Sequence, residues 1–174
     1  DGQGGTSTQD IAVTVQFVPP PVLVTITVSP ATVVENGTGN LLFTFTRDMT
    51  AGSLVVNFNV SGSATLNGND YAAIGATTFS GTSGTVTFTS GSATATVTID
   101  PTPDSTPELD ETVILTVLST SNYQAGSPET ATGTITNDDT SFAISAASAD
   151  KSEGNASTTP FTFTTLLSLP ETAI

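Results

Sequence analysis

The 174-residue chain contains no cysteine and no histidine. Without cysteine it forms no disulfide and offers no thiol chemistry. Without histidine, Ser-His-Asp and Cys-His catalytic arrangements are impossible within the chain, and zinc, copper and haem sites lose their usual ligands. Tryptophan is also absent and tyrosine occurs only twice. An aromatic platform for stacking sugars is therefore not expected.

Basic residues are scarce as well. Arg47 and Lys151 face 16 acidic residues, which gives a net charge of −14 at pH 7. Such a chain repels nucleic acid and anionic membranes and attracts cations, so we expect neither a nucleic-acid partner nor membrane insertion. No apolar run is long enough to cross a bilayer. The chain opens with DGQGGTSTQD, without methionine or a signal peptide, and we expect a mature or internal segment of a longer protein.

Alternating apolar and polar residues dominate what remains. This period is typical of strands with one buried face, and no segment shows convincing helical spacing. The alternating segments are 22–28, 41–46, 54–60, 85–89, 93–99, 112–118 and 131–137. They predict an all-β fold, an immunoglobulin-like seven-stranded antiparallel sandwich. The predicted inward-facing residues are Val24, Ile26, Val28, Phe43, Phe45, Val56, Phe58, Val86, Phe88, Val97, Ile99, Val113, Leu115 and Ile135.

The chain also repeats itself. The segment that starts at Ile26 matches the segment that starts at Ile144 after a shift of 118 residues without a gap, which aligns Phe45 with Phe163. Two strands cannot bury a sandwich core alone. We therefore predict one complete module with partial β modules on either side. The predicted divisions are a last strand of a preceding module (1–17), a proline-rich linker (18–22), a complete sandwich (22–139) and the first strands of a second repeat (140–174).

Acidic residues gather at the strand ends and loops of the complete module. They are Glu35, Asp70, Asp100, Asp104, Glu108, Asp110, Glu111, Asp138 and Asp139. Because strands alternate in direction, these loops can meet at one pole, where packed carboxylates repel each other. The simplest neutraliser is a hard cation with many oxygen ligands, Ca²⁺, with Mg²⁺ as second choice because it requires fewer, stricter ligands. The alternative is that these acids are solvated loop charges.

Five segments resemble the Calx-beta domain, a module of the sodium–calcium exchanger regulatory region and of many large bacterial surface proteins. They are VVEN (33–36), GNDYAAI (68–74), SGTVTFTSGSATATVTIDP (83–101), DSTPELDETVILTVL (104–118) and ATGTITNDD (131–139). Their order and separation match the family as well as their residue types. The resemblance implies a seven-stranded sandwich that binds Ca²⁺ at one pole. Residues 1–17 resemble the end of a bacterial cadherin-like repeat.

The resemblance also implies roles for individual residues. The implied metal ligands are Glu35, Asp70, Asp104, the Thr106 carbonyl, Glu108, Glu111, Asp138 and Asp139. The last two would close the site at the junction to the next module, whereas Asp110 is expected to point outward. Pro103 stands where the family often has a second acid beside Asp104, and Asn137 stands where it often has aspartate. We therefore expect fewer or weaker ions than in the best-endowed members.

These observations favour a calcium-binding structural repeat of a large extracellular surface or matrix protein, adhesin-like and not an enzyme. Its partners would be neighbouring β modules of the same or adjacent chains. The alternative is a subunit of an extracellular filament, a homopolymer in which incomplete modules complete one another by strand addition. A glycoside hydrolase with paired carboxylates is disfavoured, because sugar-stacking aromatics and cleft-forming insertions are missing.

Overall fold

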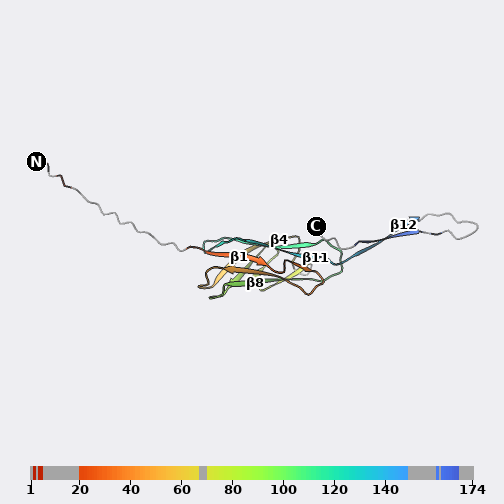
Figure 1. The fold of residues 1–174 in the computed structure, drawn as a ribbon, viewed down its shortest axis with the longest axis horizontal. Coiled ribbons are helices and arrows are strands. Elements are labelled where there is room, and N and C mark those ends of the chain that lie inside the picture. The colour runs from red at the N-terminus through yellow and green to blue at the C-terminus, as the bar shows by residue number, and fades with distance from the viewer. Residues whose placement is uncertain are drawn as a thin grey trace, which may run out of the picture.

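The computed structural model describes residues 20–66, 70–148 and 162–168, together with residues 2, 4, 5 and 160. These residues form strands, turns and loops, and none of them is helical. Two sheets pack face to face into an elongated sandwich, and a separate two-stranded sheet follows it (Figure 1). The predicted all-β sandwich is confirmed.

The sandwich consists of a five-stranded and a six-stranded sheet. In spatial order the first sheet contains β10 (Tyr123–Ala125), β1 (Val22–Val28), β3 (Leu41–Arg47), β8 (Thr94–Pro101) and β5 (Tyr71–Ile74). The second contains β2 (Thr32–Val34), β11 (Thr130–Thr136), β9 (Glu111–Val117), β4 (Leu54–Gly62), β7 (Ser83–Phe88) and β6 (Thr78–Phe79).

The seven long strands correspond to the seven alternating segments of the sequence, with small differences at their ends. Neighbouring long strands pair antiparallel, as predicted. Two short strands depart from this pattern, because β10 pairs parallel with β1 and β2 pairs parallel with β11. Both lie at sheet edges, where they extend the hydrogen bonding of the first and last long strands.

The core lies between the sheets and contains the predicted side chains. All are buried except Val28, which is only partly buried at the end of β1. Tyr71 and Tyr123 join the core from the short strands β5 and β10. The Tyr123 hydroxyl accepts a hydrogen bond of 2.7 Å from the main-chain N–H of Asn57, so its polar atom is satisfied inside an apolar layer.

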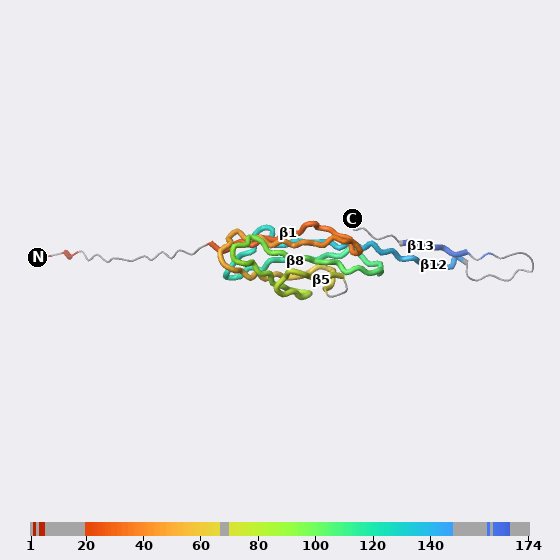
Figure 2. Tube along the Cα trace, turned by 90° about the horizontal axis from the view of Figure 1, so that it is seen from below, coloured from red at the N-terminus to blue at the C-terminus, as the bar shows by residue number. Residues whose placement is uncertain are grey.

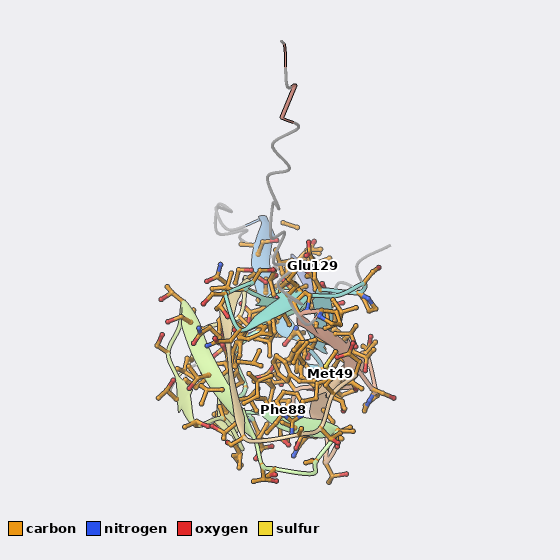
Figure 3. All side chains as sticks on the ribbon, turned by 90° about the vertical axis from the view of Figure 1, so that its left-hand side faces the viewer. Met49, Phe88 and Glu129 are labelled. Carbon is orange, nitrogen blue, oxygen red and sulfur yellow. The ribbon has the colours of Figure 1, made fainter. Side chains whose placement is uncertain are left out.

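One pole of the sandwich is closed by Arg47, a charged residue that is buried at the end of β3. Its guanidinium donates to the main-chain carbonyls of four loop residues and lies 5.1 Å from the centroid of the Phe88 ring. The four carbonyls belong to Thr50, Gly52, Thr89 and Ser92. Figure 3 looks onto this end, where Met49 and Glu129 lie at the surface and Phe88 lies between the sheets.

The opposite pole leads into the separate sheet, a hairpin of β12 (Ser141–Ser148) and β13 (Thr162–Ser168). These strands pair only with each other and project beyond the end of the sandwich (Figures 1 and 2). Ile144 lies opposite Thr165, whereas the repeat aligns it with Ile26, which lies opposite Phe45. The register therefore differs by two residues, a shift that keeps each side chain on the same face.

Some sequence predictions fall outside the described residues. They include the last strand predicted within residues 1–17, most of the linker, and Phe161, which the 118-residue repeat aligns with Phe43. Within the described part of the chain, no helix has the length and apolar character needed to cross a membrane.

Candidate metal centre

The predicted ligands lie at the pole from which β12 departs. Glu35 directly follows β2, Asp70 directly precedes β5, and Glu111 is the first residue of β9. Asp104 and Glu108 lie in the loop that connects β8 to β9, and Asp138 and Asp139 follow β11. The strand ends of both sheets thus bring these acids to one pole of the sandwich.

Six of the acids form two compact groups. We call Glu35, Asp104 and Asp139 the linker triad, and Asp70, Glu108 and Glu111 the loop triad. In each triad, one carboxylate oxygen from every member lies within 4.8 Å of the others. A small depression adjoins the loop triad and Glu35. It is lined by Glu35, Asp70, Glu108, Leu109, Glu111, Ile135 and Asn137.

Glu35 is the most buried carboxylate of the linker triad, with 6% of its surface exposed. The pKa of Glu35 is raised from 4.5 to about 6, mainly by burial and then by the negative charges of Asp104, Asp139 and Glu108. A main-chain hydrogen bond from Asp104 opposes this shift. The ionised form of the Glu35 side chain is therefore favoured only when a positive charge lies nearby.

Glu111 of the loop triad is half-buried, and its pKa is raised in the same way as that of Glu35. Its pKa is raised to about 7, mainly by burial and then by the charge of Asp70 and a side-chain hydrogen bond with Asp70. The pKa of Glu108 is raised as well, by partial desolvation and by Asp70, Asp104 and Asp139. Asp104 and Asp139 of the linker triad raise the pKa of Glu108, and Glu35 raises that of Glu111. The two triads therefore form one electrostatic cluster.

Local hydrogen bonds hold two aspartates of the cluster in place. The Oδ1 atom of Asp104 accepts from the main-chain N–H of Thr106 at 2.6 Å, which closes a tight turn in the β8–β9 loop. The Oδ2 atom of Asp70 accepts from the hydroxyl of Thr65 at 2.7 Å and from the main-chain N–H of the same residue. Thr106 is exposed beside Asp104, and the ligand role of its carbonyl stays a prediction.

Asp138 belongs to neither triad. It is exposed, and its Oδ1 atom accepts a 2.9 Å hydrogen bond from the side-chain amide of Asn36. The same amide lies 3.4 Å from Oδ1 of Asp139. The neutral amide of Asn36 therefore lies beside both adjacent carboxylates. Of the two aspartates, Asp139 alone belongs to a triad.

The turn after β11 orients Asp139. Asn137 is buried, and its side-chain oxygen accepts from the main-chain N–H of Asp139 while its amide donates to the Asp139 carbonyl. Asp110 does not simply point outward, as the sequence suggested. It is half-buried, and its Oδ1 atom accepts from the main-chain N–H of Asn137 at 3.1 Å. Asp110 therefore ties the β8–β9 loop to the exit of the sandwich.

A buried oxygen at this pole lacks a partner. The Oδ2 atom of Asp139 is the buried side-chain oxygen in the described part of the chain that makes no hydrogen bond. A buried carboxylate oxygen without a partner costs free energy of about 1–3 kcal/mol or more. Because Asp139 also belongs to the linker triad, this part of the pole offers a place for a cation.

Sequence reasoning missed the role of Asn36 and wrongly expected Asp110 to point outward. The amide of Asn36 reaches two linker carboxylates, and Asp110 fixes the turn that carries Asp139. Asn36 follows Glu35 directly, so its position beside the cluster was available as a signal. The contact between Asp110 and Asn137 spans 27 residues and depends on how β9 and β11 pair.

Comparison with protein-family models finds no match, and no curated protein matches the chain. Several solved structures resemble it. The apo-form Calx CBD1 domain is 20% identical with a TM-score of 0.49, covering 67% of this chain and 98% of that one. CBD12 from CALX1.2 is 20% identical with a TM-score of 0.50, covering 70% and 49%. The calcium binding domain CBD12 of CALX1.1 is 22% identical with a TM-score of 0.50, covering 68% and 47%.

At these identities the comparisons establish the fold. The sandwich has the fold of the Calx CBD domains, in agreement with the resemblance of the sequence to Calx-beta. The matches span about half the length of the two CBD12 chains, and about two thirds of this one.

Proposed function

We propose that the acidic pole binds Ca²⁺ through the linker triad and the loop triad. The observation that carries this proposal is the arrangement of six carboxylates in two groups whose oxygens lie within 4.8 Å of one another. Ordinary solvated loop charges would spread apart, because like charges at this distance repel by several kcal/mol outside bulk water. The cluster instead spans both sheets and includes the buried Glu35.

The residues present fit a hard cation. All six side chains offer oxygen atoms, and the unpartnered Oδ2 atom of Asp139 would gain a partner from a bound ion. The raised pKa values of Glu35 and Glu111 would return toward the ordinary range once a positive charge lies between the carboxylates. The solved structures of similar fold include one described as a calcium binding domain, which supports the choice of ion.

The donor set favours Ca²⁺ over Mg²⁺. Ca²⁺ accepts six to eight oxygen ligands in flexible geometry, whereas Mg²⁺ requires near-ideal octahedral geometry and keeps several waters. Six carboxylates from four separate chain segments suit the more tolerant ion. The ion would supply charge neutralisation and cross-linking of loops, and the chain would supply all of the anionic ligands.

The position of the linker triad favours a structural role between modules. Asp139 lies two residues before β12, so an ion held by Asp139, Glu35 and Asp104 would restrain the chain where it leaves the sandwich. We infer a repeat module that is rigidified by Ca²⁺ in a large extracellular or cell-surface protein. Extracellular modules work with dissociation constants of about 10⁻⁴–10⁻³ M, because external calcium is plentiful. The absence of cysteine suits secretion without oxidative folding.

Thermal unfolding tests the calcium proposal directly. The 174-residue protein, stripped of metal, is melted alone, with millimolar calcium and with millimolar magnesium. Calcium at a hundredfold excess over its dissociation constant should add about 2.7 kcal/mol to the free energy of unfolding, and magnesium should add clearly less. An identical melting temperature in all three conditions would refute the calcium site.

A second candidate function rests on the hairpin of β12 and β13. Neither strand contains a charged residue, in a chain of net charge −14. Phe142, Ile144 and Phe163 lie on one face of the hairpin and are 61–63% exposed. Their counterparts under the 118-residue repeat, Val24, Ile26 and Phe45, are fully buried under the second sheet. The hairpin therefore has the pattern of the first strands of a second module.

This apolar face would be covered by β strands of a neighbouring module. In the filament alternative the strands come from a second copy of the chain, which adds to the exposed edge of the hairpin. Sedimentation over a wide concentration range tests this alternative, with Phe163→Ser as the comparison. Concentration-dependent association that Phe163→Ser abolishes supports it, and a monomer at all concentrations counts against it.

A further inference from the structure

Asn36 and Gly37 form an Asn-Gly step inside the acidic pole. Glu35 of the linker triad directly precedes them, and the Asn36 amide donates to Asp138 at 2.9 Å and lies 3.4 Å from Oδ1 of Asp139. Both residues of the step are exposed to water. The amide is thus the neutral member of a group of side chains that is otherwise anionic.

Glycine fits closely into the turn at position 37. The main-chain N–H of Gly37 donates to the carbonyl of Val34 at 3.1 Å, which closes a turn after β2. A Cβ atom at position 37 would lie 3.0 Å from that carbonyl oxygen, so a residue with a side chain fits only if the turn yields by a few tenths of an ångström. Glycine also leaves its own main-chain nitrogen unshielded by a side chain. The residue that fits this turn most easily is therefore the one that makes the preceding asparagine chemically labile.

We propose that Asn36 is a site of spontaneous deamidation, which converts its amide into a further carboxylate at the acidic pole. The Gly37 nitrogen loses its proton to water or hydroxide and attacks Cγ of Asn36. A C–N bond forms to give a five-membered imide, and the bond from Cγ to Nδ2 breaks, with nitrogen leaving as ammonia. Water then opens the imide at either carbonyl and leaves aspartate or isoaspartate at position 36. The net reaction consumes one water and releases one ammonia.

The fold controls the rate of this reaction. In the closed turn the Gly37 N–H is engaged with Val34 and the Asn36 amide is held by carboxylates, so the nitrogen and Cγ react only when the turn opens. A Ca²⁺ ion bound by Glu35 and Asp139 would hold both flanks of Asn36 and reduce that opening. This link between calcium and rate rests on the proposed function, whereas the reaction itself does not.

The product changes the chemistry of the pole. A carboxylate at position 36 would face Asp138 and Asp139, where the amide donates now. Without an ion, the added negative charge increases repulsion and loosens the exit of the sandwich. With an ion, it offers another anionic ligand, and calcium affinity rises with the number of ligand charges. Deamidation would therefore make the module more dependent on calcium as the protein ages.

Mass spectrometry of the full chain tests the modification. Folded protein is incubated at neutral to mildly alkaline pH with chelator or with millimolar calcium, beside a denatured sample that gives the rate of the open chain. Trypsin cleavage after Arg47 and Lys151 separates the Asn36-Gly37 step from Asn67-Gly68, which provides an internal comparison. Fragment ions then locate the acid. We expect conversion at position 36 in chelator, more slowly than in the denatured chain, and several-fold slower again in calcium.

An encoded aspartate tests the consequence. Asn36→Asp should bind calcium roughly tenfold more tightly than the unmodified chain, and it should melt at a lower temperature in chelator. Asn36→Gln keeps an amide and should show neither change. An amide that stays intact at position 36 after the denatured chain has converted overturns the proposal. An unchanged calcium affinity of Asn36→Asp overturns the predicted consequence of the modification. If calorimetry shows that the unmodified chain binds no calcium, the proposed function fails, but conversion in chelator still decides the modification.

Discussion

The main-chain N–H of Asn137 donates a 3.1 Å hydrogen bond to Oδ1 of Asp110. This bond connects the end of the β8–β9 loop, which carries Glu108, to the turn that carries Asp139. Glu108 belongs to the loop triad and Asp139 to the linker triad. The contact therefore links the two carboxylate groups through the main chain, at the point where the chain leaves the sandwich toward β12.

Asp110→Ala should weaken calcium binding although Asp110 is in neither triad. Loss of one hydrogen bond to a charged acceptor should lower the free energy of unfolding by about 1.5–3 kcal/mol. The freed turn should also raise the calcium dissociation constant several-fold, because Asp139 is no longer held in place. Calorimetric titration and thermal unfolding measure the two effects. A variant with lower stability and an unchanged dissociation constant would limit Asp110 to a role in folding.

Asp138 and Asp139 provide a matched pair for the linker triad. Asp139→Asn removes the charge of a triad member with a buried oxygen, whereas Asp138→Asn removes the charge of an exposed neighbour outside both triads. The first substitution should abolish most of the rise in melting temperature that calcium produces, and the second should leave most of it. Equal losses in the two variants would restore Asp138 as a ligand, as the family resemblance implies.

The raised pKa values predict an unusual pH dependence without calcium. Burial and neighbouring anions raise the pKa of Glu35 to about 6 and of Glu111 to about 7, from 4.5. The folded state thus binds more protons than the unfolded state between about pH 4.5 and 7. Proton binding therefore adds on the order of a few kcal/mol to the free energy of unfolding at low pH. This contribution is lost as the pH rises through 6–7.

Melting curves of metal-free protein across this pH range measure the effect, with dialysis in place of a chelator because chelators themselves titrate. The stability gained from added calcium should grow over the same range, since protons compete with the ion. Glu35→Gln combined with Glu111→Gln should flatten both trends. A metal-free protein whose stability rises from pH 5 to 7 would contradict the assigned repulsion.

The long strands could be predicted from the sequence because alternation extends over six or more residues in most of them. Short strands such as β2, β5 and β10 offer too few positions for a period to emerge. The buried Tyr123 was missed for the same reason, because it lies on the short strand β10. The burial of Arg47 could have been predicted, since Arg47 continues the inward-facing series of Phe43 and Phe45. It was not predicted because a charged side chain is not expected in a core.

The site was predictable as a set of residues and not as an arrangement. Strand-end acids from several loops indicate a shared pole, and six of the implied ligands do lie together. Their division into two triads depends on the path of the β8–β9 loop, which sends Asp104 to one group and Glu108 to the other. The separation of Asp138 from Asp139 depends on the side-chain amide of Asn36, a contact across 102 residues.

Arg47 allows the two poles to be tested independently. Arg47→Ala removes the donor to four main-chain carbonyls and the contact with the Phe88 ring. It should lower the free energy of unfolding by at least about 3 kcal/mol. Because Arg47 closes the pole opposite the triads, the stability gained from calcium should be unchanged in this variant. A reduced calcium increment would show that the poles are coupled through the sheets.

The loop triad provides the most direct distinction between a metal site and solvated charge. Glu108→Gln with Glu111→Gln removes two charges and keeps the shape of both side chains. The matched control, Asp48→Asn with Glu129→Gln, removes two charges from acids outside both triads, of which Glu129 is visible in Figure 3 at the other pole. If the acids only provide solubility, both pairs should change stability by no more than about 0.5 kcal/mol, with or without calcium.

If the acids hold an ion, the two pairs of substitutions should differ in their effect on stability both without calcium and with calcium. Without calcium, the loop-triad pair should melt at a higher temperature than the unmodified chain, because the substitutions relieve the repulsion that raises the pKa of Glu111. With calcium, the same pair should lose most of the gain of about 2.7 kcal/mol expected at a hundredfold excess of ligand. The control pair should retain that gain. A loop-triad pair that behaves like its control in both conditions would show that these carboxylates hold no ion.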